Sequence, residues 1–253
     1  MSRHEALKLN LKALSLPTAL AVVDELLETA ERESWSPEAF ARVLSERELD
    51  GRRLRRIERL AKAANLPAAK TLTALDTKRL PERIRRQLPV LCAGDFVGRA
   101  DNVLLFGLPG RGKTHVAAAI GHELVAAGRR VLFSPTFRLV DRLLRAKRDL
   151  ELERELRRLD RFEVLILDDI GYVQQSREEM EVLFTLLAER YERRSVVITS
   201  NLVFSQWDRI FKDAMTTAAA IDRVVHHSII LEFGAETRSV RADQAARRNK
   251  EAA

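Results

Sequence analysis

The sequence predicts an α/β protein in which a small, all-helical N-terminal domain precedes a domain built on a parallel five-stranded sheet. Two observations predict the sheet. Beyond about residue 98, short apolar runs of strand length alternate with longer segments of helical periodicity, the pattern of parallel strands joined by helices. A glycine-rich turn also follows the first of these runs and opens a helix, as expected at the carboxyl edge of such a sheet.

The helical N-terminal domain is expected over residues 1–65. Leucine and valine residues recur at helical spacing in the first part of this region. Ser36-Pro37 is a typical helix start, with an N-cap residue before a proline at the first helical position, and that helix is expected to run to Leu49. Asp50-Gly51 predicts a break, and a basic helix is expected over residues 52–64.

The second domain is expected over residues 66–253, and it begins with a mixed stretch that prolines interrupt up to residue 98. Its predicted strands are residues 103–106, 130–134, 164–167, 195–199 and 228–233. Its predicted helices are residues 113–127, 137–159 and 176–192. The last helix begins with Ser176 and Glu179 at the spacing of a capping box.

Residues 107–114 read Gly-Leu-Pro-Gly-Arg-Gly-Lys-Thr and have the pattern of a phosphate-binding loop, with a strand before it and a helix after it. Glycines are needed because backbone N–H groups must close around phosphate oxygens. Lys113 is expected to reach the β- and γ-phosphates of ATP, and the Thr114 hydroxyl to bind Mg²⁺. The predicted nucleotide-binding residues are Gly107, Pro109, Gly110, Arg111, Gly112, Lys113 and Thr114. The alternative is a glycine-rich turn that matches by chance.

Two predicted strands end in polar residues that this site requires. Asp168 and Asp169 follow the third strand, where Asp168 is expected to hold Mg²⁺ through water and Asp169 to polarise the attacking water. Asn201 follows the fourth strand and is expected to hold that water and to sense the γ-phosphate. Taken alone, acids and asparagine after a strand are also common turn residues.

Arg223 and the two histidines that follow it lie just before the last predicted strand. Arg223 could act on the γ-phosphate of a neighbouring subunit, or it could form a salt bridge with Asp222. His226 and His227 are expected to be packing or surface residues rather than metal ligands, because no acidic or cysteine partner stands at suitable spacing.

The net charge of +7 and the pI of about 9.9 favour an anionic partner. Arginines at three- and four-residue spacing predict a helix face that contacts DNA phosphates. These residues are Arg52, Arg55, Arg56 and Arg59. A second basic group follows the second strand and consists of Arg138, Arg142, Arg145, Lys147 and Arg148. The alternative for each group is a solvated charged face.

Membrane and disulfide chemistry are not expected. The longest apolar runs have strand length, and the N-terminus lacks the apolar core of a signal peptide. Cys92 is the single cysteine, which excludes an intramolecular disulfide and a cysteine-based zinc site. We therefore expect a cytoplasmic protein that does not enter a membrane.

Several segments together resemble one family. They are residues 107–115, 165–172, 176–179, 190–193, 199–201, 204–207 and 219–228. From about residue 60 to residue 241, the chain resembles the IstB family, which are AAA+ helper ATPases encoded beside the transposase in a class of bacterial insertion sequences. The helical N-terminal region resembles the family more loosely.

The resemblance implies an AAA+ domain with strand order 5-1-4-3-2. It implies that Asn201 is the sensor 1 residue, that Arg223 is an arginine finger, that Arg238 acts as sensor 2, and that His115 belongs to the nucleotide site. It further implies binding to duplex DNA, ATP-dependent assembly into homo-oligomers on it, and help to a transposase in choosing target sites. Asp169 departs from the glutamate that is usual in AAA+ proteins, so slow hydrolysis is expected.

Two other functional classes share the phosphate-binding loop. A replicative helicase loader of the DnaC type has the same ATPase core, but residues 204–207 and 226–228 favour the IstB-like function. A metabolic P-loop kinase would need a lid and an acceptor-substrate site, and the basic helical N-terminus offers neither. The leading hypothesis is an ATPase that regulates transposition, and the alternative is a helicase loader.

Overall fold

The computed structural model describes residues 3–170, 176–202 and 224–234, and the chain divides into two compact units, residues 1–59 and 60–253. Each unit has its own hydrophobic core. The predicted domain boundary near residue 65 stays a prediction. In the described part of the chain, every helix is too short or too polar to cross a lipid bilayer.

Three helices build the N-terminal unit, which is helical as expected. They are α1 (Arg3–Ala13), α2 (Pro17–Arg32) and the first part of α3 (Pro37–Ala64). Leu11, Ala19 and Val23 form the buried centre of the unit. Leu11 belongs to α1 and Ala19 and Val23 to α2, while Phe40 and Leu44 of α3 pack against them, so the apolar residues at helical spacing face one core.

The predicted break at Asp50-Gly51 is wrong, because α3 passes through these residues without interruption. Gly51 allows another helix to approach α3 closely and does not end α3. A Cβ atom on Gly51 would lie 2.0 Å from the Thr18 hydroxyl oxygen of α2. The missing side chain therefore lets the start of α2 pack on the middle of α3, which outweighs the low helix propensity of glycine.

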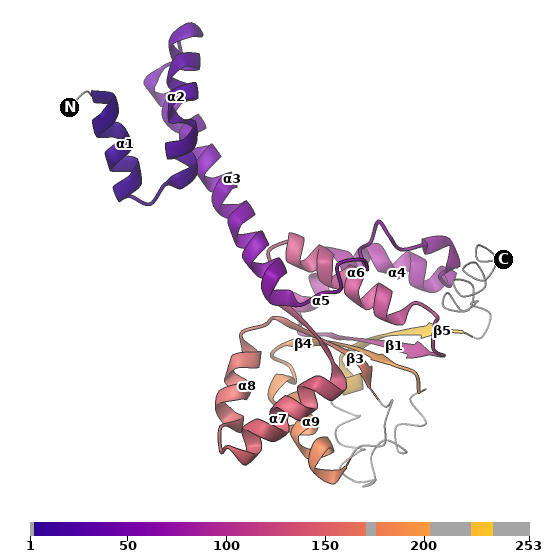
Figure 1. Cartoon of the computed structure of the whole chain (residues 1–253). Helices are drawn as coiled ribbons and strands as arrows, with labels where there is room; N and C mark the ends of the chain where they lie inside the picture. The colour runs from indigo at the N-terminus through magenta and orange to yellow at the C-terminus, as the bar shows by residue number, and fades with distance from the viewer. Residues whose placement is uncertain (1–2, 171–175, 203–223, 235–253) are drawn as a thin grey trace, which may run out of the picture. The chain divides into compact units, whose positions relative to one another are not determined.

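The second unit contains one sheet and the helices around it (Figure 1). A 3-10 turn η1 (Thr77–Arg79) and helices α4 (Glu82–Ala93) and α5 (Asp95–Gly98) precede the first strand. The strands are β1 (Asn102–Gly107), β2 (Val131–Pro135), β3 (Val164–Ile170), β4 (Ser195–Ser200) and β5 (Ser228–Phe233). The remaining helices are α6 (Lys113–Ala126), α7 (Thr136–Arg148), α8 (Leu152–Asp160) and α9 (Arg177–Arg190).

All five strands pair in parallel in the order β2-β3-β4-β1-β5. This confirms the predicted order 5-1-4-3-2, read from the other edge. The predicted strand positions are confirmed to within a few residues, and the predicted helix over 137–159 is divided into α7 and α8. Because β1 lies beside β4, the end of β4 comes next to the glycine-rich turn that follows β1.

Helices cover both faces of the sheet, with α4, α5 and α6 on one face and α7, α8 and α9 on the other (Figure 1). Alternate residues of β1 point into the hydrophobic cores on opposite faces of the sheet. Val103 and Leu105 pack with α4 and α6, whereas Leu104 and Phe106 pack with α7 and α9. Strands buried on both faces are continuously apolar, which is why short apolar runs in the sequence predict them correctly.

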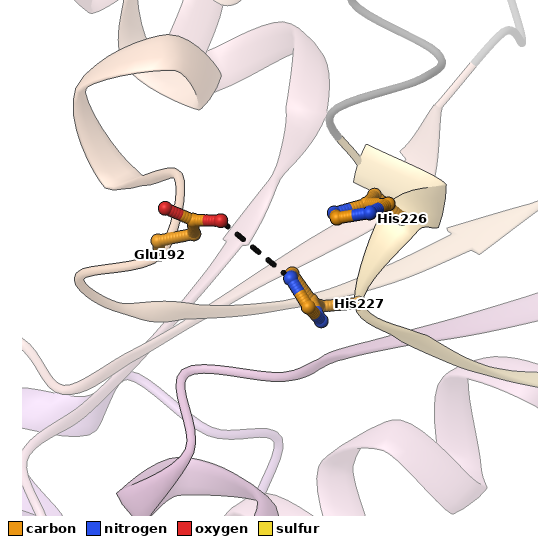
Figure 2. Close-up of side chains that lie close together, drawn as sticks. All are labelled: Glu192, His226 and His227. Atoms are coloured by element: carbon orange, nitrogen blue, oxygen red, sulfur yellow. Dashed lines mark ion pairs between the residues drawn. The ribbon is translucent and has the colours of Figure 1, made fainter.

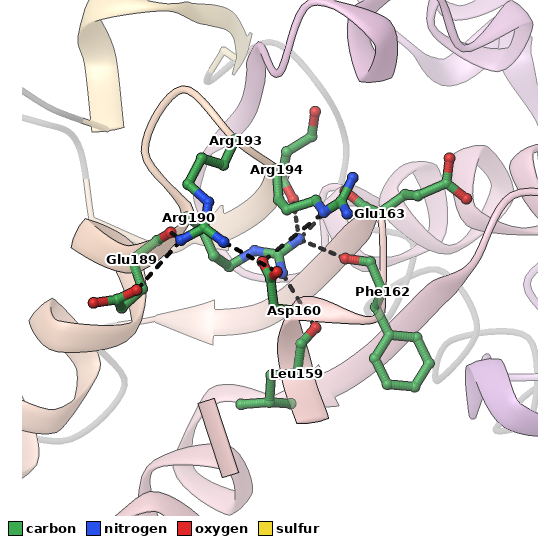
Figure 3. A network of polar contacts seen from close by, with 9 residues as sticks. Leu159, Asp160, Phe162, Glu163, Glu189, Arg190, Arg193 and Arg194 are labelled. Atoms are coloured by element: carbon green, nitrogen blue, oxygen red, sulfur yellow. Dashed lines mark hydrogen bonds and ion pairs between the residues drawn. The ribbon is translucent and has the colours of Figure 1, made fainter. Parts of the chain in front are cut away.

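A buried arginine organises the amino edge of the sheet, where the strands begin (Figure 3). Arg190, at the end of α9, is only 2% exposed. Its guanidinium donates hydrogen bonds of 3.0–3.3 Å to the carbonyl oxygens of Leu159, Phe162, Glu163 and Ser195. Desolvation by burial lowers the pKa of Arg190 to about 9, so the side chain is still charged at neutral pH. Arg190 of α9 therefore contacts the backbone of α8, of the segment before β3 and of the start of β4.

Asn102 has a similar role at the start of β1. Its side chain accepts a hydrogen bond from the Val196 backbone N–H at 3.0 Å and donates one to the Val224 carbonyl oxygen at 3.0 Å. Its own backbone N–H donates to the His227 carbonyl oxygen at 2.7 Å. Asn102 thus holds β4 and the segment before β5 against β1.

Candidate nucleotide-binding site

The glycine-rich turn lies at the carboxyl edge of the sheet, between β1 and α6. It contains Gly107, Pro109, Gly110, Arg111, Gly112, Lys113 and Thr114, so the structure brings together the residues that the sequence predicts to surround phosphate. Gly112 is the N-cap of α6 and has φ +96°, a left-handed conformation that favours glycine. The first N–H groups of α6 therefore face the turn, as in other anion-binding helix starts.

Lys113 is held inside this turn. Its side chain is 6% exposed, and its ammonium group donates to the carbonyl oxygens of Gly107 at 2.5 Å and Leu108 at 2.9 Å. The same ammonium donates to Asn201 Oδ1 at 2.7 Å, across the sheet from the end of β4. The predicted convergence of the turn and Asn201 is thus present in the structure.

A β-bulge places the two acids at the end of β3. Leu167 pairs with Ile198 and Ile170 pairs with Ser200, so Asp168 and Asp169 together oppose the single residue Thr199. Asp169 has φ +63°, which aspartate tolerates better than most residues. In a regular strand, two consecutive side chains would point to opposite faces of the sheet. The bulge instead lets both acids engage the end of β4, and such irregularities are common beside active sites.

Thr199 joins these acids, a role that its sequence pattern does not predict. Its hydroxyl donates to Asp168 Oδ1 at 2.7 Å and accepts from the Asp169 backbone N–H at 2.8 Å. The Thr136 hydroxyl, at the start of α7, donates to the Asp168 carbonyl oxygen at 3.0 Å. The sequence carries only a weak signal for this role, a hydroxyl residue at the end of a strand, because the bulge that creates it is a tertiary feature.

Asn201 connects the acids to the lysine. Its Nδ2 atom donates to Asp169 Oδ1 at 2.6 Å, while its Oδ1 atom accepts from Lys113. A continuous polar chain therefore runs from Lys113 through Asn201 to Asp169. All three side chains lie at the carboxyl edge of the sheet.

Two further residues of the predicted set have distinct surroundings. The Arg111 Nε atom is buried and has no hydrogen-bond partner among the residues that the structure describes. An anion in the turn would supply one. His115 Nε2 forms a hydrogen bond with the Thr71 carbonyl oxygen at 3.0 Å, which links α6 to the segment before α4. The role of His115 in nucleotide binding stays a prediction, and Arg223 and Arg238 lie outside the described residues.

The first basic group includes two arginines with intramolecular partners. Arg52 and Arg55 each pair with Glu48 Oε1 at 3.0 Å, and Arg55 also donates to the Thr18 hydroxyl at 2.5 Å. Glu48 is only 5% exposed, and its other carboxylate oxygen accepts from the backbone N–H groups of Thr18 and Ala19. Desolvation of Glu48 opposes ionisation, but these N–H groups and the two arginines lower its pKa overall.

Arg56 and Arg59 are exposed on the same helix. In the second basic group, Arg142 pairs with Glu155, Arg145 pairs with Asp141 at 2.7 Å, and Arg138 lies 5.7 Å from the centre of the Phe137 ring. DNA phosphates would therefore compete with carboxylates at several of these positions. Contact with DNA stays a prediction for both groups.

Comparison with known proteins identifies a family of ATP-binding proteins that this chain matches. Residues 9–247 match a protein-family model described as IstB-like ATP binding protein. An insertion-sequence ATP-binding protein of Sinorhizobium fredii is 43% identical over 241 residues, which are 95% of this chain and 81% of that protein.

Two solved structures show the same fold at low sequence identity. A DnaA protein of Aquifex aeolicus with AMPPCP bound has a TM-score of 0.57 and 17% identity, over 74% of this chain and 56% of that one. The DnaC helicase loader has a TM-score of 0.51 and 22% identity, over 60% of this chain and 89% of that one. These likenesses confirm the predicted AAA+ type of fold.

Proposed function

This chain belongs to the family of IstB-like ATP-binding proteins, and we propose that it is an ATP-hydrolysing, DNA-binding helper of a transposase encoded by the same insertion sequence. The observation that carries the ATPase part is the polar chain from Lys113 through Asn201 to Asp169 at the carboxyl edge of the sheet. It places a cation for phosphate, an amide and a carboxylate within one hydrogen-bonded set.

In hydrolysis, a water oxygen attacks the γ-phosphorus of ATP, the bond from that phosphorus to the β–γ bridging oxygen breaks, and ADP leaves. Asp169 accepts a proton from the water, and Asn201 orients it. Lys113 exchanges its bonds to Gly107, Leu108 and Asn201 for phosphate oxygens. The Asp169 side chain is shorter than the usual glutamate and holds water farther from the phosphorus, so turnover is slow.

A hydroxyl and a carboxylate at this edge fit Mg²⁺, because oxygen atoms are its preferred ligands. Thr114 and, through water, Asp168 would hold the ion, which neutralises charge on the phosphates. The hydrogen bond from Thr199 to Asp168 orients the carboxylate. Outer-shell contacts of this kind tune the affinity of metal sites.

Assembly and DNA binding complete the proposal. Arg223 of one subunit acts on the ATP of its neighbour, so ATP favours homo-oligomers and oligomers favour hydrolysis. Arg52, Arg55, Arg56 and Arg59 contact duplex phosphates, as do Arg138, Arg142 and Arg145. Binding of this kind reads little base sequence and depends on counterion release. The assembled protein then directs the transposase to target DNA.

The test measures ATP hydrolysis and duplex binding together, over a salt series. The unaltered protein should bind duplex DNA more tightly with ATP, and that binding should weaken steeply as salt rises. Lys113→Ala should lower hydrolysis about 10²-fold or more and remove the ATP dependence of DNA binding. Lys12→Ala, which changes an exposed lysine of α1, is the matched control and should leave both unchanged.

Three results would overturn the proposal. Hydrolysis that Lys113→Ala leaves intact would remove the ATPase assignment. Arg223→Ala should retain nucleotide binding but lose oligomer-stimulated hydrolysis, and full activity would remove its role in a neighbouring site. Tight, ATP-controlled binding to a replicative helicase without affinity for duplex DNA or for the transposase would favour a helicase loader.

A further inference from the structure

Two histidines and a glutamate lie close together (Figure 2), next to the starts of β4 and β5 at the amino edge of the sheet. Glu192 lies in the turn between α9 and β4, and His226 and His227 immediately precede β5. We propose that Glu192, His226 and His227 form a binding site for a transition-metal ion of the Zn²⁺ type. This site is independent of the Mg²⁺ ion that accompanies ATP.

The ligand atoms are close enough to share one ion. One nitrogen of each imidazole and one carboxylate oxygen of Glu192 all lie within 4.8 Å of one another. His227 Nε2 and a Glu192 carboxylate oxygen are 3.5 Å apart. Ligand atoms on a tetrahedral zinc ion, at the usual bond lengths, are about 3.4 Å apart. The three side chains are exposed, so a small rotation of each can close the remaining difference.

A second contact orients one of the imidazoles. The Tyr191 hydroxyl forms a hydrogen bond with His226 Nδ1 at 3.1 Å, which engages that nitrogen and leaves Nε2 for a metal ion. Metal-binding histidines usually have their other ring nitrogen held in this manner. Tyr191 and Glu192 are adjacent in the chain, so one turn supplies both a ligand and the group that orients another ligand.

The backbone on both sides of the site is held in place. Asn102 donates from its backbone N–H to the His227 carbonyl oxygen and from its side chain to the Val224 carbonyl oxygen. Glu192 has φ +56°, a conformation that turns the chain sharply after α9. Sites on a rigid support lose less entropy when they bind an ion. A bound ion would join the α9–β4 turn to the segment before β5.

His226 and His227 were predicted to be packing or surface residues because no acidic or cysteine partner stands at suitable spacing in the sequence. The structure corrects the reason for that expectation. Glu192 is remote in the sequence, but β4 and β5 flank β1, which brings the start of β4 and the start of β5 to the same edge. The acidic partner is therefore supplied by the fold and not by local spacing.

The chemistry of the ligands selects the type of ion. Two imidazoles and one carboxylate suit Zn²⁺, Co²⁺, Ni²⁺ or Cu²⁺, whereas Mg²⁺ prefers oxygen ligands and keeps much of its water. Three protein ligands leave at least one position for water or another group. Excess Mg²⁺ should therefore saturate the nucleotide site without occupying this one.

The experiment titrates Co²⁺ into the untagged full chain in excess Mg²⁺ and without nucleotide, and follows the visible absorption of bound Co²⁺. One equivalent should bind, and Zn²⁺ should displace it. His226→Ala, His227→Ala and Glu192→Gln should each weaken binding about 10-fold or more. Tyr191→Phe should weaken it by about 10-fold, the lower end of the range for outer-shell groups.

His4→Ala is the matched control, because His4 is also exposed and paired with a carboxylate, Asp24, at 2.6 Å. It should leave Co²⁺ affinity unchanged. Binding that the three ligand variants do not weaken, or that His4→Ala weakens equally, would overturn the proposal, as would an absence of bound Co²⁺ at millimolar concentration. Because the readout is absorption, the result does not depend on whether the protein hydrolyses ATP.

Discussion

The two edges of the sheet both carry clusters of buried or half-buried polar groups, but these groups are satisfied in different ways. At the amino edge, Arg190 and Asn102 bond almost entirely to backbone atoms. At the carboxyl edge, Lys113 bonds to two backbone carbonyl oxygens of the glycine-rich turn, and Asn201 joins it to Asp169 through side chains. The backbone partners at the amino edge belong to the ends of helices and strands, whereas a ligand can replace a side chain or a turn as partner at the carboxyl edge.

This difference separates the buried groups that stabilise the sheet from the groups that we propose to act on nucleotide. Removing a group from the amino edge takes hydrogen-bond partners away from buried backbone atoms, which costs free energy of unfolding. Removing a group from the carboxyl edge leaves side chains that can turn towards water. Variants at the two edges should therefore change different measured quantities, and four predictions test this in order of expected effect.

Arg190→Met should have the largest effect, lowering the free energy of unfolding by about 3–5 kcal/mol. Four backbone carbonyl oxygens would lose a charged donor that no water can easily replace. Urea unfolding would measure the loss. Nucleotide affinity should be unchanged in the fraction that is still folded. A loss of affinity with unchanged stability would contradict the proposed separation of the two edges.

Asn201→Ala should lower ATP hydrolysis by about 10–10²-fold, because the attacking water and Lys113 both lose a partner. Its urea midpoint should change little. Steady-state kinetics would show whether the loss is in kcat rather than in KM. The matched control is Asn65→Ala, which removes a side chain whose amide donates at 3.4 Å to a carbonyl oxygen away from the site.

Thr199→Val should lower hydrolysis by about 10-fold and raise the Mg²⁺ concentration needed for half-maximal activity. Valine keeps the shape of threonine but loses the hydroxyl that joins Asp168 to the Asp169 backbone. Thr199→Ser should restore most of the activity, because it restores the hydroxyl. If valine and serine behaved alike, packing rather than hydrogen bonding would explain the effect.

Glu163→Gln should have the smallest effect, about 1 kcal/mol of unfolding free energy at neutral pH. Desolvation of Glu163 raises its pKa, but hydrogen bonds from the Arg130 backbone and the Arg129 side chain lower it overall. The carboxylate therefore stabilises the fold above its ordinary pKa of about 4.5, and this contribution is lost as the pH falls through the lowered value. The glutamine variant should show a shallower loss of stability on acidification, and an unchanged pH profile would contradict this account.

Local patterns in the sequence determined much of this protein. Continuous apolar strands predicted the sheet, and the glycine-rich sequence before Lys113 predicted a turn between a strand and a helix, where we propose that phosphate binds. The meeting of Asp168, Asp169 and Asn201 at one edge was also predictable, since parallel strands end at the same edge of a sheet, while their roles in catalysis stay predictions. These features depend on neighbours in the chain.

Only the tertiary structure decided the contacts between strands and helices that are distant in the sequence. The sequence predicts a helix break at Gly51, but in the structure Thr18 packs where a Cβ atom of this residue would lie. The bulge at Asp169, the role of Thr199 and the place of Glu192 beside two histidines follow from strand order and register. Strand order depends on which apolar faces, remote from one another in the sequence, pack together. The spacing of residues along one chain does not reveal the free energy of that packing.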